Sequence, residues 1–260
     1  MIDIINAYNF EDPIYYLFYY LFQLQIPANN TKDLKCFNLH HGNPYLQLGP
    51  FKYEMILKEP EIGLFHQLIT PQEAENMKNL ARTKMISTPY NVGGKNELFS
   101  KLRTSKIMYM NENLVKEAMA VSRKIHWATR MNLFYERFAS ENFQVMNYGI
   151  SGKISIHLDS TGEVIENGTS SNNGTSEWNE IGGQRFVTFM VYLSSVEAGG
   201  ATAFPQPGIS IKPEIGSALY WFNMGAQNNF DSRILHLGNK SYIKPCLRCM
   251  KVFEYLKSYK

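Results

Sequence analysis

Hydrophobic residues follow two different spacings along this 260-residue chain, and the spacing changes near residue 144. Residues 70–83 begin with Thr70 and Pro71 and carry acidic residues in their first turn, which predicts a helix capped by Thr70. Residues 112–131 predict a second helix, because their apolar residues recur at intervals of three and four. This apolar stripe comprises Leu114, Ala118, Val121, Ile125 and Ala128.

After residue 144 the hydrophobic residues occur in short β-type runs separated by glycines. The runs are 144–149, 154–158, 186–193, 210–212, 218–223 and 247–255. Helices followed by many short strands predict an α+β chain that is mainly β, a β-sandwich or jelly roll with N-terminal helices packed on one side. Residues 160–184 are rich in Gly, Ser, Asn and Thr and predict a surface loop.

Residues 1–55 are predicted to form an N-terminal extension or linker to one folded unit, residues 56–260. Residues 27–50 are interrupted by Asn, Pro and Gly and predict an irregular arm. The apolar run 14–22 predicts an aromatic helix that packs on this chain or on a partner. It is shorter than the roughly 20 residues that span a bilayer, so no membrane span is expected. No basic segment or small-residue cleavage site is present, so no signal peptide is expected.

The composition excludes some functions and leaves the compartment open. The chain has 26 Lys and Arg against 23 Asp and Glu, a net charge of +3, so charge alone predicts no nucleic-acid partner. Three cysteines (Cys36, Cys246 and Cys249) are too few for a disulfide framework. Sequons that would carry glycans in a lumenal glycoprotein occur at Asn29, Asn167, Asn173 and Asn239.

A candidate metal site follows from the strand ending at residue 157. His157 and Asp159 are two residues apart, so a strand presents both side chains on one face. His236 follows after a second set of strands, and two His with one carboxylate form the facial triad of non-haem Fe(II) oxygenases. By itself a His-x-Asp pair is more often a surface His beside a surface Asp than a metal site, so the surrounding motifs decide between the two interpretations.

Several motifs follow one another in a characteristic order. They include Asn147-Tyr-Gly-Ile-Ser-Gly-Lys-Ile-Ser-Ile-His-Leu-Asp159, Gly183-Gln-Arg-Phe-Val-Thr-Phe-Met-Val-Tyr-Leu-Ser194, Val196-Glu-Ala-Gly-Gly-Ala-Thr-Ala-Phe-Pro205, Gly216-Ser-Ala-Leu-Tyr-Trp-Phe-Asn223 and Asp231-Ser-Arg-Ile-Leu-His236. Upstream motifs lie at 43–52, 103–105 and 141–149. Together they resemble the catalytic domain of the collagen-type prolyl 4-hydroxylase α subunit, over roughly residues 34–260.

This resemblance implies a double-stranded β-helix core in which His157, Asp159 and His236 are the metal and catalytic residues that hold Fe(II). It implies 2-oxoglutarate as cosubstrate, L-ascorbate as a reductant of oxidised iron, and a proline-rich or collagen-like peptide as substrate. The endoplasmic reticulum lumen and protein disulfide isomerase as partner subunit are implied as well. The protein's share of such chemistry is binding and positioning.

The resemblance also assigns residues on the strand from 183 to 194. Arg185 matches an Arg that contacts the peptide in the family, and the alternative is a solvated charge at a strand start. Thr188 is assigned to the 2-oxoglutarate site. Tyr192 and Trp221 are candidates for the aromatic walls of a groove for a polyproline II peptide, or else they are core residues.

The chain departs from the family where the far carboxylate of 2-oxoglutarate is bound. Family members carry a Lys ten residues after the second His, and this chain has Cys246 there. Lys244 and Arg248 lie two residues to either side, on the same face of a strand but about 6–7 Å away. Arg248 is the stronger candidate replacement, because a guanidinium fork fits a carboxylate. Cys246 and Cys249 form a C-x-x-C that is only weak evidence for a redox or zinc motif, and Cys246 is interpreted as a buried free thiol.

Three further family positions differ, since Ile154, Val252 and Asn239 stand where relatives carry Tyr, Trp and Cys. Two functional hypotheses therefore follow. The first is an active peptidyl-proline dioxygenase with a replaced anchor. The second is a catalytically impaired relative that serves as a proline-rich-peptide or subunit binding module.

Overall fold

A computed structural model describes residues 34–87, 90–92, 95–97, 105–131, 140–150, 152–159, 183–225, 231–238 and 247–256. Most of the described elements are strands. In chain order they are β1 (Cys36–Leu39), α2 (Pro44–Leu48), β2 (Phe51–Leu57), β3 (Ile62–His66), α3 (Pro71–Arg82), β4 (Ile86–Ser87), β5 (Tyr90–Val92), β6 (Lys95–Glu97), β7 (Lys106–Met110), α4 (Lys116–Thr129), β8 (Phe143–Asn147), β9 (Ile154–His157), β10 (Gly183–Tyr192), β11 (Thr202–Phe204), β12 (Ile209–Ile211), β13 (Ala218–Phe222), a 3-10 turn (Ser232–Ile234), β14 (His236–Gly238) and β15 (Leu247–Leu256).

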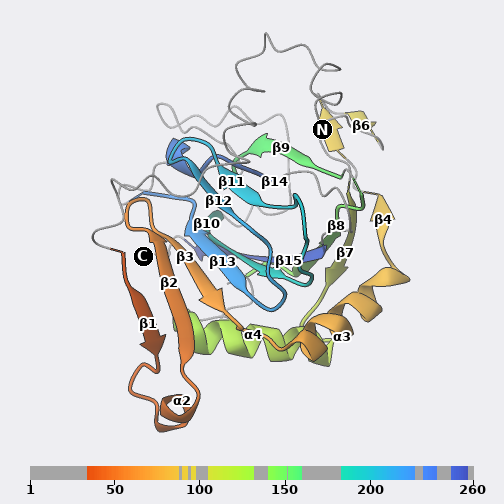
Figure 1. The fold of residues 1–260 in the computed structure, drawn as a ribbon. Helices are drawn as coiled ribbons and strands as arrows, with labels where there is room; N and C mark the ends of the chain where they lie inside the picture. Colours follow the sequence, from red (N-terminus) through yellow and green to blue (C-terminus); the bar gives the residue numbers. More distant parts are fainter. Residues whose placement is uncertain are drawn as a thin grey trace.

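Two antiparallel sheets and the helices α3 and α4 form three layers (Figure 1), and β5 and β6 pair in a separate two-stranded sheet. The larger sheet has the strand order β1-β2-β3-β13-β10-β15-β8-β7-β4, and the smaller has the order β12-β11-β14-β9. The smaller sheet lies on one face of the larger one, and α3 and α4 lie on the other face. The prediction of a mainly β chain with helices packed on one side is confirmed.

Strand β13 shows how alternation of side chains builds both cores. Leu219 and Trp221 point between the sheets, where Phe204 of the smaller sheet packs against Trp221. Ala218 and Tyr220 point the other way, into the core under the helices. Trp221 is fully buried, and burying a side chain of this kind stabilises the fold by about 1.5–3 kcal/mol.

Helix α3 forms where the sequence predicts it, at Pro71–Arg82. Thr70 caps it with a complete capping box, since Glu73 N donates to Thr70 Oγ1 (3.2 Å) and Thr70 N donates to Glu73 Oε2 (2.7 Å). Its buried stripe, Ala74, Met77 and Ala81, packs toward the larger sheet.

Helix α4 begins at Lys116, four residues later than predicted. Residues 111–114 form a turn instead, in which Asn113 N donates to Asn111 Oδ1 (2.8 Å) and Leu114 N to the Asn111 carbonyl (3.1 Å). Leu114 is therefore 84% exposed and does not join the apolar stripe. Asn commonly competes for backbone groups in this way and favours turns over helix interiors.

The predicted order of helices first and strands afterwards was wrong, because β1, β2 and β3 precede α3. Residues 36–39 and 44–48, expected in an irregular arm, form β1 and α2. Strand β1 is an exposed edge strand with no buried residue, so it lacks the alternation that would reveal it. The division of the chain after residue 55 stays a prediction, and that position lies inside β2.

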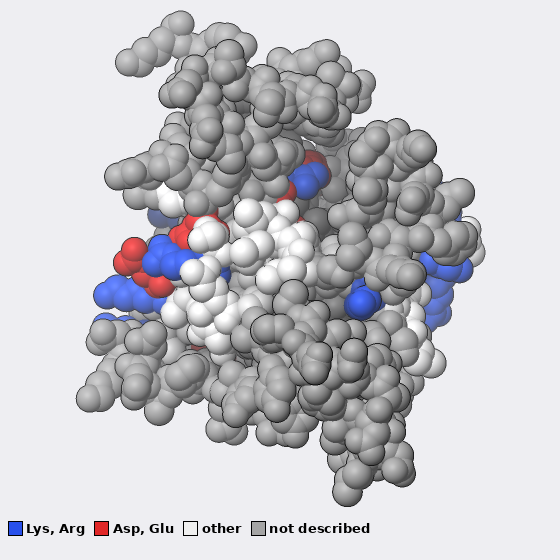
Figure 2. Space-filling view, turned by 90° about the horizontal axis from the view of Figure 1, so that it is seen from above, with Lys and Arg blue, Asp and Glu red and all other residues white. Residues whose placement is uncertain are grey.

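Several predicted features lie outside the described residues. These are the run 14–22, the four sequons, Lys244, Cys246 and most of the loop at 160–184, whose last two residues already belong to β10. Within the described part of the chain, no helix combines the length and apolar character that crossing a membrane requires. On the face shown in Figure 2, the described Lys and Arg atoms lie in separate places, some of them beside Asp or Glu.

Candidate metal centre

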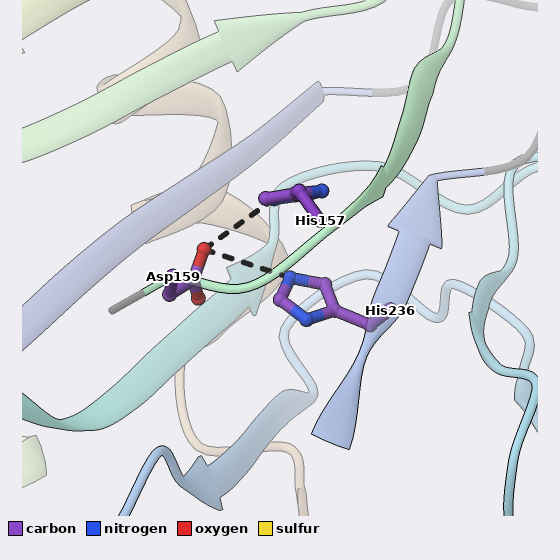
Figure 3. A group of neighbouring side chains, drawn as sticks. All are labelled: His157, Asp159 and His236. Carbon is purple, nitrogen blue, oxygen red and sulfur yellow. Dashed lines mark ion pairs between the residues drawn. The ribbon is translucent and has the colours of Figure 1, made fainter. Parts of the chain in front are cut away.

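The smaller sheet brings His157, Asp159 and His236 together (Figure 3). His157 ends β9, and Asp159 follows two residues later. His236 begins β14, which pairs with β9 in antiparallel register so that His236 lies directly opposite His157. Their ring centroids are 4.3 Å apart. Strand pairing thus brings His236 to His157 and Asp159, which are already close in sequence.

One ligand atom from each of the three residues lies within 4.8 Å of the others. Asp159 Oδ1 is 3.4 Å from His157 Nε2 and 3.6 Å from His236 Nε2. His236 Nδ1 donates to the Ile234 carbonyl (3.0 Å), and this bond leaves Nε2 as the nitrogen that faces the carboxylate. Two imidazoles and one carboxylate in this arrangement suit a divalent transition metal.

The Asp159 carboxylate is buried, with only 4% of its surface exposed. Burial alone would raise its pKa, but the charge of His236, the hydrogen bond and charge of His157, and a hydrogen bond from Thr188 together hold the pKa well below its ordinary value. Thr188 Oγ1 donates to Asp159 Oδ2 at 2.6 Å. The carboxylate is thus kept in the ionised form that binds metals.

Asn223 supports this arrangement from behind Thr188. Its Nδ2 donates to Thr188 Oγ1 (2.9 Å), so the threonine hydroxyl proton is directed toward Asp159. Both Thr188 and Asn223 are fully buried. The Oδ1 atom of Asn223 has no hydrogen-bond partner in the described structure, so the amide depends on this one bond for its position.

A cavity of about 230 Å³ opens beside the three residues. Polar groups from several strands reach it, including Tyr109, Gln144, Tyr148 and Thr202. Trp221 lines it and packs its ring edge-on against His236 at 4.7 Å. Trp221 Nε1 is buried without a partner among the described atoms, which leaves a hydrogen-bond donor unused at this site.

Arg185 lies in the wall of the same cavity and is not a solvated charge. Its Nε and NH2 donate to the two carboxylate oxygens of Glu141, at 2.5 and 3.0 Å. Its NH1 donates to the Asp159 carbonyl (3.1 Å). This fork-to-carboxylate geometry fixes the guanidinium close to the backbone of the predicted metal ligand.

The structure places the other predicted site residues differently. Thr188 contacts Asp159, and Tyr192 is fully buried with its hydroxyl 2.8 Å from Thr202 Oγ1. Tyr192 and Trp221 are core residues, the second of the two interpretations given to them. Trp221 nevertheless lines the metal-centre cavity, and the role of either ring as a wall of a peptide groove stays a prediction. Arg248 lies on β15 at a register position opposite both Met146 and Tyr192, and Met146 lines the cavity.

Sequence reasoning did not identify Glu141, Asn223, Tyr109 or Gln144 as site residues. Asn223 closes the motif at 216–223, and Glu141 opens the motif at 141–149, so both stood in quoted segments without a role. No periodicity marks them, because each acts through a residue 35 or more positions away.

A mainly β fold with a His-Asp-His cluster beside a cavity, two of its three members buried, defines a candidate metal-dependent oxygenase of the facial-triad class. Among solved structures, the fold is shared with a viral collagen prolyl hydroxylase from Paramecium Bursaria Chlorella virus-1 in complex with 2-oxoglutarate. The TM-score is 0.52 at 16% identity, covering 74% of this chain and 95% of that one. A truncated form of the same enzyme gives a TM-score of 0.51 at 17% identity, covering 75% and 90%.

Matches in sequence narrow the family further than the shared fold does. Human prolyl 4-hydroxylase subunit alpha-3 is 32% identical over 214 residues, 82% of this chain and 36% of the relative. Prolyl 4-hydroxylase subunit alpha-2 of Gallus gallus is 30% identical over 216 residues, 82% of this chain and 38% of the relative. No protein-family profile matches the chain. The chain spans somewhat over a third of the length of these relatives, and over that span its resemblance to prolyl 4-hydroxylase alpha subunits is confirmed.

Proposed function

We propose that this protein is an Fe(II)- and 2-oxoglutarate-dependent dioxygenase that hydroxylates peptidyl proline, with residues 56–260 as its catalytic unit, folded as a double-stranded β-helix. The observation that carries the proposal is the cluster of His157, Asp159 and His236 beside a cavity. Relatives named as prolyl 4-hydroxylase subunits support the reaction class. Residues 1–55 are proposed as an extension of this unit.

The residues present fit the metal. The two histidine Nε2 atoms and Asp159 Oδ1 converge, the carboxylate is ionised, and Ile234 fixes the tautomer of His236. Bound iron would supply the activation of O2 and the oxidative decarboxylation of 2-oxoglutarate. The chain's own contribution is to hold the three ligands from one side, to orient the carboxylate through Thr188, and to shield His236 and Asp159 from water.

The far carboxylate of 2-oxoglutarate is proposed to bind Arg248, with Lys244 as the alternative, since Cys246 stands at the family's Lys position. Support comes from the register of β15, in which Arg248 lies opposite Met146, a cavity-lining residue. A cation is required in such a site because a carboxylate buried without one loses about 3–5 kcal/mol. Two other polar groups lie near the same cavity: the Thr188 hydroxyl, which already donates to Asp159, and Trp221 Nε1, which has no partner among the described atoms.

Substrate, partners and compartment are proposed by family analogy. A proline-rich or collagen-like peptide is the proposed substrate, and Arg185 at the cavity wall is the proposed peptide contact. L-Ascorbate as reductant, protein disulfide isomerase as partner subunit, the endoplasmic reticulum lumen and N-glycosylation complete the proposal.

The proposal is tested by anaerobic titration of the Fe(II)-loaded protein with 2-oxoglutarate, followed through the visible metal-to-ligand charge-transfer band. A saturable band is expected in the wild type, with a marked loss of affinity in Arg248→Ala and little change in Lys244→Ala. The opposite ranking would identify Lys244 as the anchor. Succinate release that depends on added (Pro-Pro-Gly)n peptide would then establish the peptidyl-proline substrate.

The second candidate function is a metal-bearing binding module for proline-rich peptides, and the replacement of the family Lys by Cys246 favours it. Iron binding without a charge-transfer band at millimolar 2-oxoglutarate would refute the dioxygenase and support this module. Restoration of the band by Cys246→Lys would show that the anchor alone separates the two functions.

A further inference from the structure

A second cavity, of about 340 Å³, lies on the opposite face of the larger sheet from the metal centre. Strand β13 separates the two cavities, because Trp221 lines the metal-centre cavity while Tyr220 and Phe222 line the second one. Strand β1 supplies Phe37 and Leu39, and the end of α4 supplies Ala128. None of the proposed chemistry uses this cavity.

Five Phe and Tyr rings line this cavity. Tyr53 lies at the centre, with ring centroids 5.9 Å from Phe37, 5.2 Å from Phe65 and 5.9 Å from Tyr220. Phe222 extends the wall by an edge contact with Tyr220 at 6.1 Å. The faces of such rings carry partial negative charge, so a wall of this kind attracts cations.

One carboxylate meets this wall. The Tyr53 hydroxyl donates to Glu61 Oε1 at 3.2 Å, and the Tyr220 hydroxyl donates to the same oxygen. Burial, together with Glu61, raises the pKa of Tyr53 to about 12 and that of Tyr220 further, so both remain donors at neutral pH. The partly buried carboxylate is thereby held in place by two phenols.

Gly63 makes this cluster possible. A Cβ at this position would come within 2.3 Å of both the Tyr220 and Tyr53 rings and within 2.6 Å of the Tyr53 hydroxyl. Only a residue without a side chain lets the two rings meet above β3. The arrangement of two tyrosines and one glutamate is therefore specified by the local sequence of β3 as well as by packing.

The charge of this cavity is unbalanced. Its described lining contains no Lys or Arg, and Glu61 forms no ion pair with any Lys, Arg or His of the described chain. The single histidine, His41, donates its Nε2 hydrogen to the Ala128 carbonyl (2.9 Å). Among the described residues, a carboxylate and five aromatic rings thus face the cavity without a compensating Lys or Arg.

We propose that this second cavity binds an organic ammonium group with an apolar stem, its charge against Glu61 and its carbon atoms against the rings of Tyr53, Phe65 and Tyr220. A free alkylammonium compound and the side chain of a lysine on a peptide offer the same chemistry. The site is independent of the proposed dioxygenase activity, because no residue of the metal centre contributes to it.

The test is isothermal titration calorimetry with choline, beside its neutral isostere 3,3-dimethylbutan-1-ol. Saturable choline binding is expected, at least tenfold tighter than binding of the isostere. Glu61→Gln keeps the acceptor atoms and removes the charge, and is expected to weaken choline binding about tenfold. Glu59→Gln is the matched control, since Glu59 is 82% exposed and lies outside the cavity.

A second variant, Phe37→Leu, tests the same cavity in case Glu61→Gln does not fold, because Phe37 is an exposed residue of the cavity lining. It is expected to weaken choline binding severalfold. N-butylammonium and a lysine-containing peptide, with its acetyl-lysine form as control, distinguish the free compound from the peptide source. Equal affinity for choline and its isostere, or no choline binding by the folded wild type, would overturn the proposal. His157→Ala is expected to bind choline as the wild type does.

Discussion

Replacing Thr188 by Val tests whether the hydroxyl behind Asp159 organises the metal centre. The substitution keeps the shape of the side chain and removes the 2.6 Å hydrogen bond to Asp159 Oδ2. Because the carboxylate is only 4% exposed, water cannot easily replace that donor. Hydrogen bonds to charged groups contribute about 1.5–3 kcal/mol, so metal affinity is expected to fall roughly 10- to 100-fold.

The same change leaves the Asn223 amide without its acceptor, since Nδ2 donates to Thr188 Oγ1. An unsatisfied buried donor costs about 1–3 kcal/mol, which should appear as a lower free energy of unfolding of the metal-free protein. Calorimetric titration with Mn(II) measures the affinity, and urea denaturation without metal measures the stability. Thr188→Ser keeps the hydroxyl and loses one methyl group, so its affinity should match the wild type while its stability falls by about 0.5–1.5 kcal/mol. Wild-type metal affinity in a folded Thr188→Val protein would refute the role given to this hydroxyl.

Three further predictions concern other contacts. Asn223→Ala is expected to weaken Mn(II) binding less than Thr188→Val, because Asn223 acts only through Thr188; an equal or larger loss on calorimetric titration would contradict this order. Gly63→Ala is expected to destabilise the protein by about 1–3 kcal/mol, measured by thermal unfolding, because its Cβ meets two tyrosine rings at 2.3 Å; unchanged stability would show that the rings move aside. Burial raises the pKa of Glu73, but Lys124 Nζ at 2.6 Å and the capping bonds with Thr70 lower it overall, so its ionised form stabilises α3. Glu73→Gln should therefore be less stable than the wild type at neutral pH. The difference in free energy of unfolding between the two proteins, measured with urea, should shrink as the pH falls below 4.5 toward the lower pKa of the folded state. A difference that does not change with pH would exclude the charge of Glu73 as its cause.

The local sequence determined those features whose physical cause is local. A Thr-Pro start with Glu three residues later is sufficient for the capping box of α3, because all its partners lie within one turn. The strands β8, β9, β10, β12, β13 and β15 follow from runs of β-type residues. His157 and Asp159 lie close because they are two residues apart, although Asp159 lies beyond the end of β9. The resemblance to known hydroxylases also rested on short motifs, each formed by residues that are consecutive in the sequence.

Tertiary structure decided which distant residues meet. His236 reaches His157 only because β14 pairs with β9, and Arg185 meets Glu141 across 44 positions of the chain. Asn223 has no local signature, since its role depends on the pairing of β13 with β10. Edge strand β1 shows no alternation because neither of its faces is buried. The second cavity likewise exists only where β1, β3, β13 and the end of α4 come together, and long-range contacts of this kind leave no periodic pattern in the sequence.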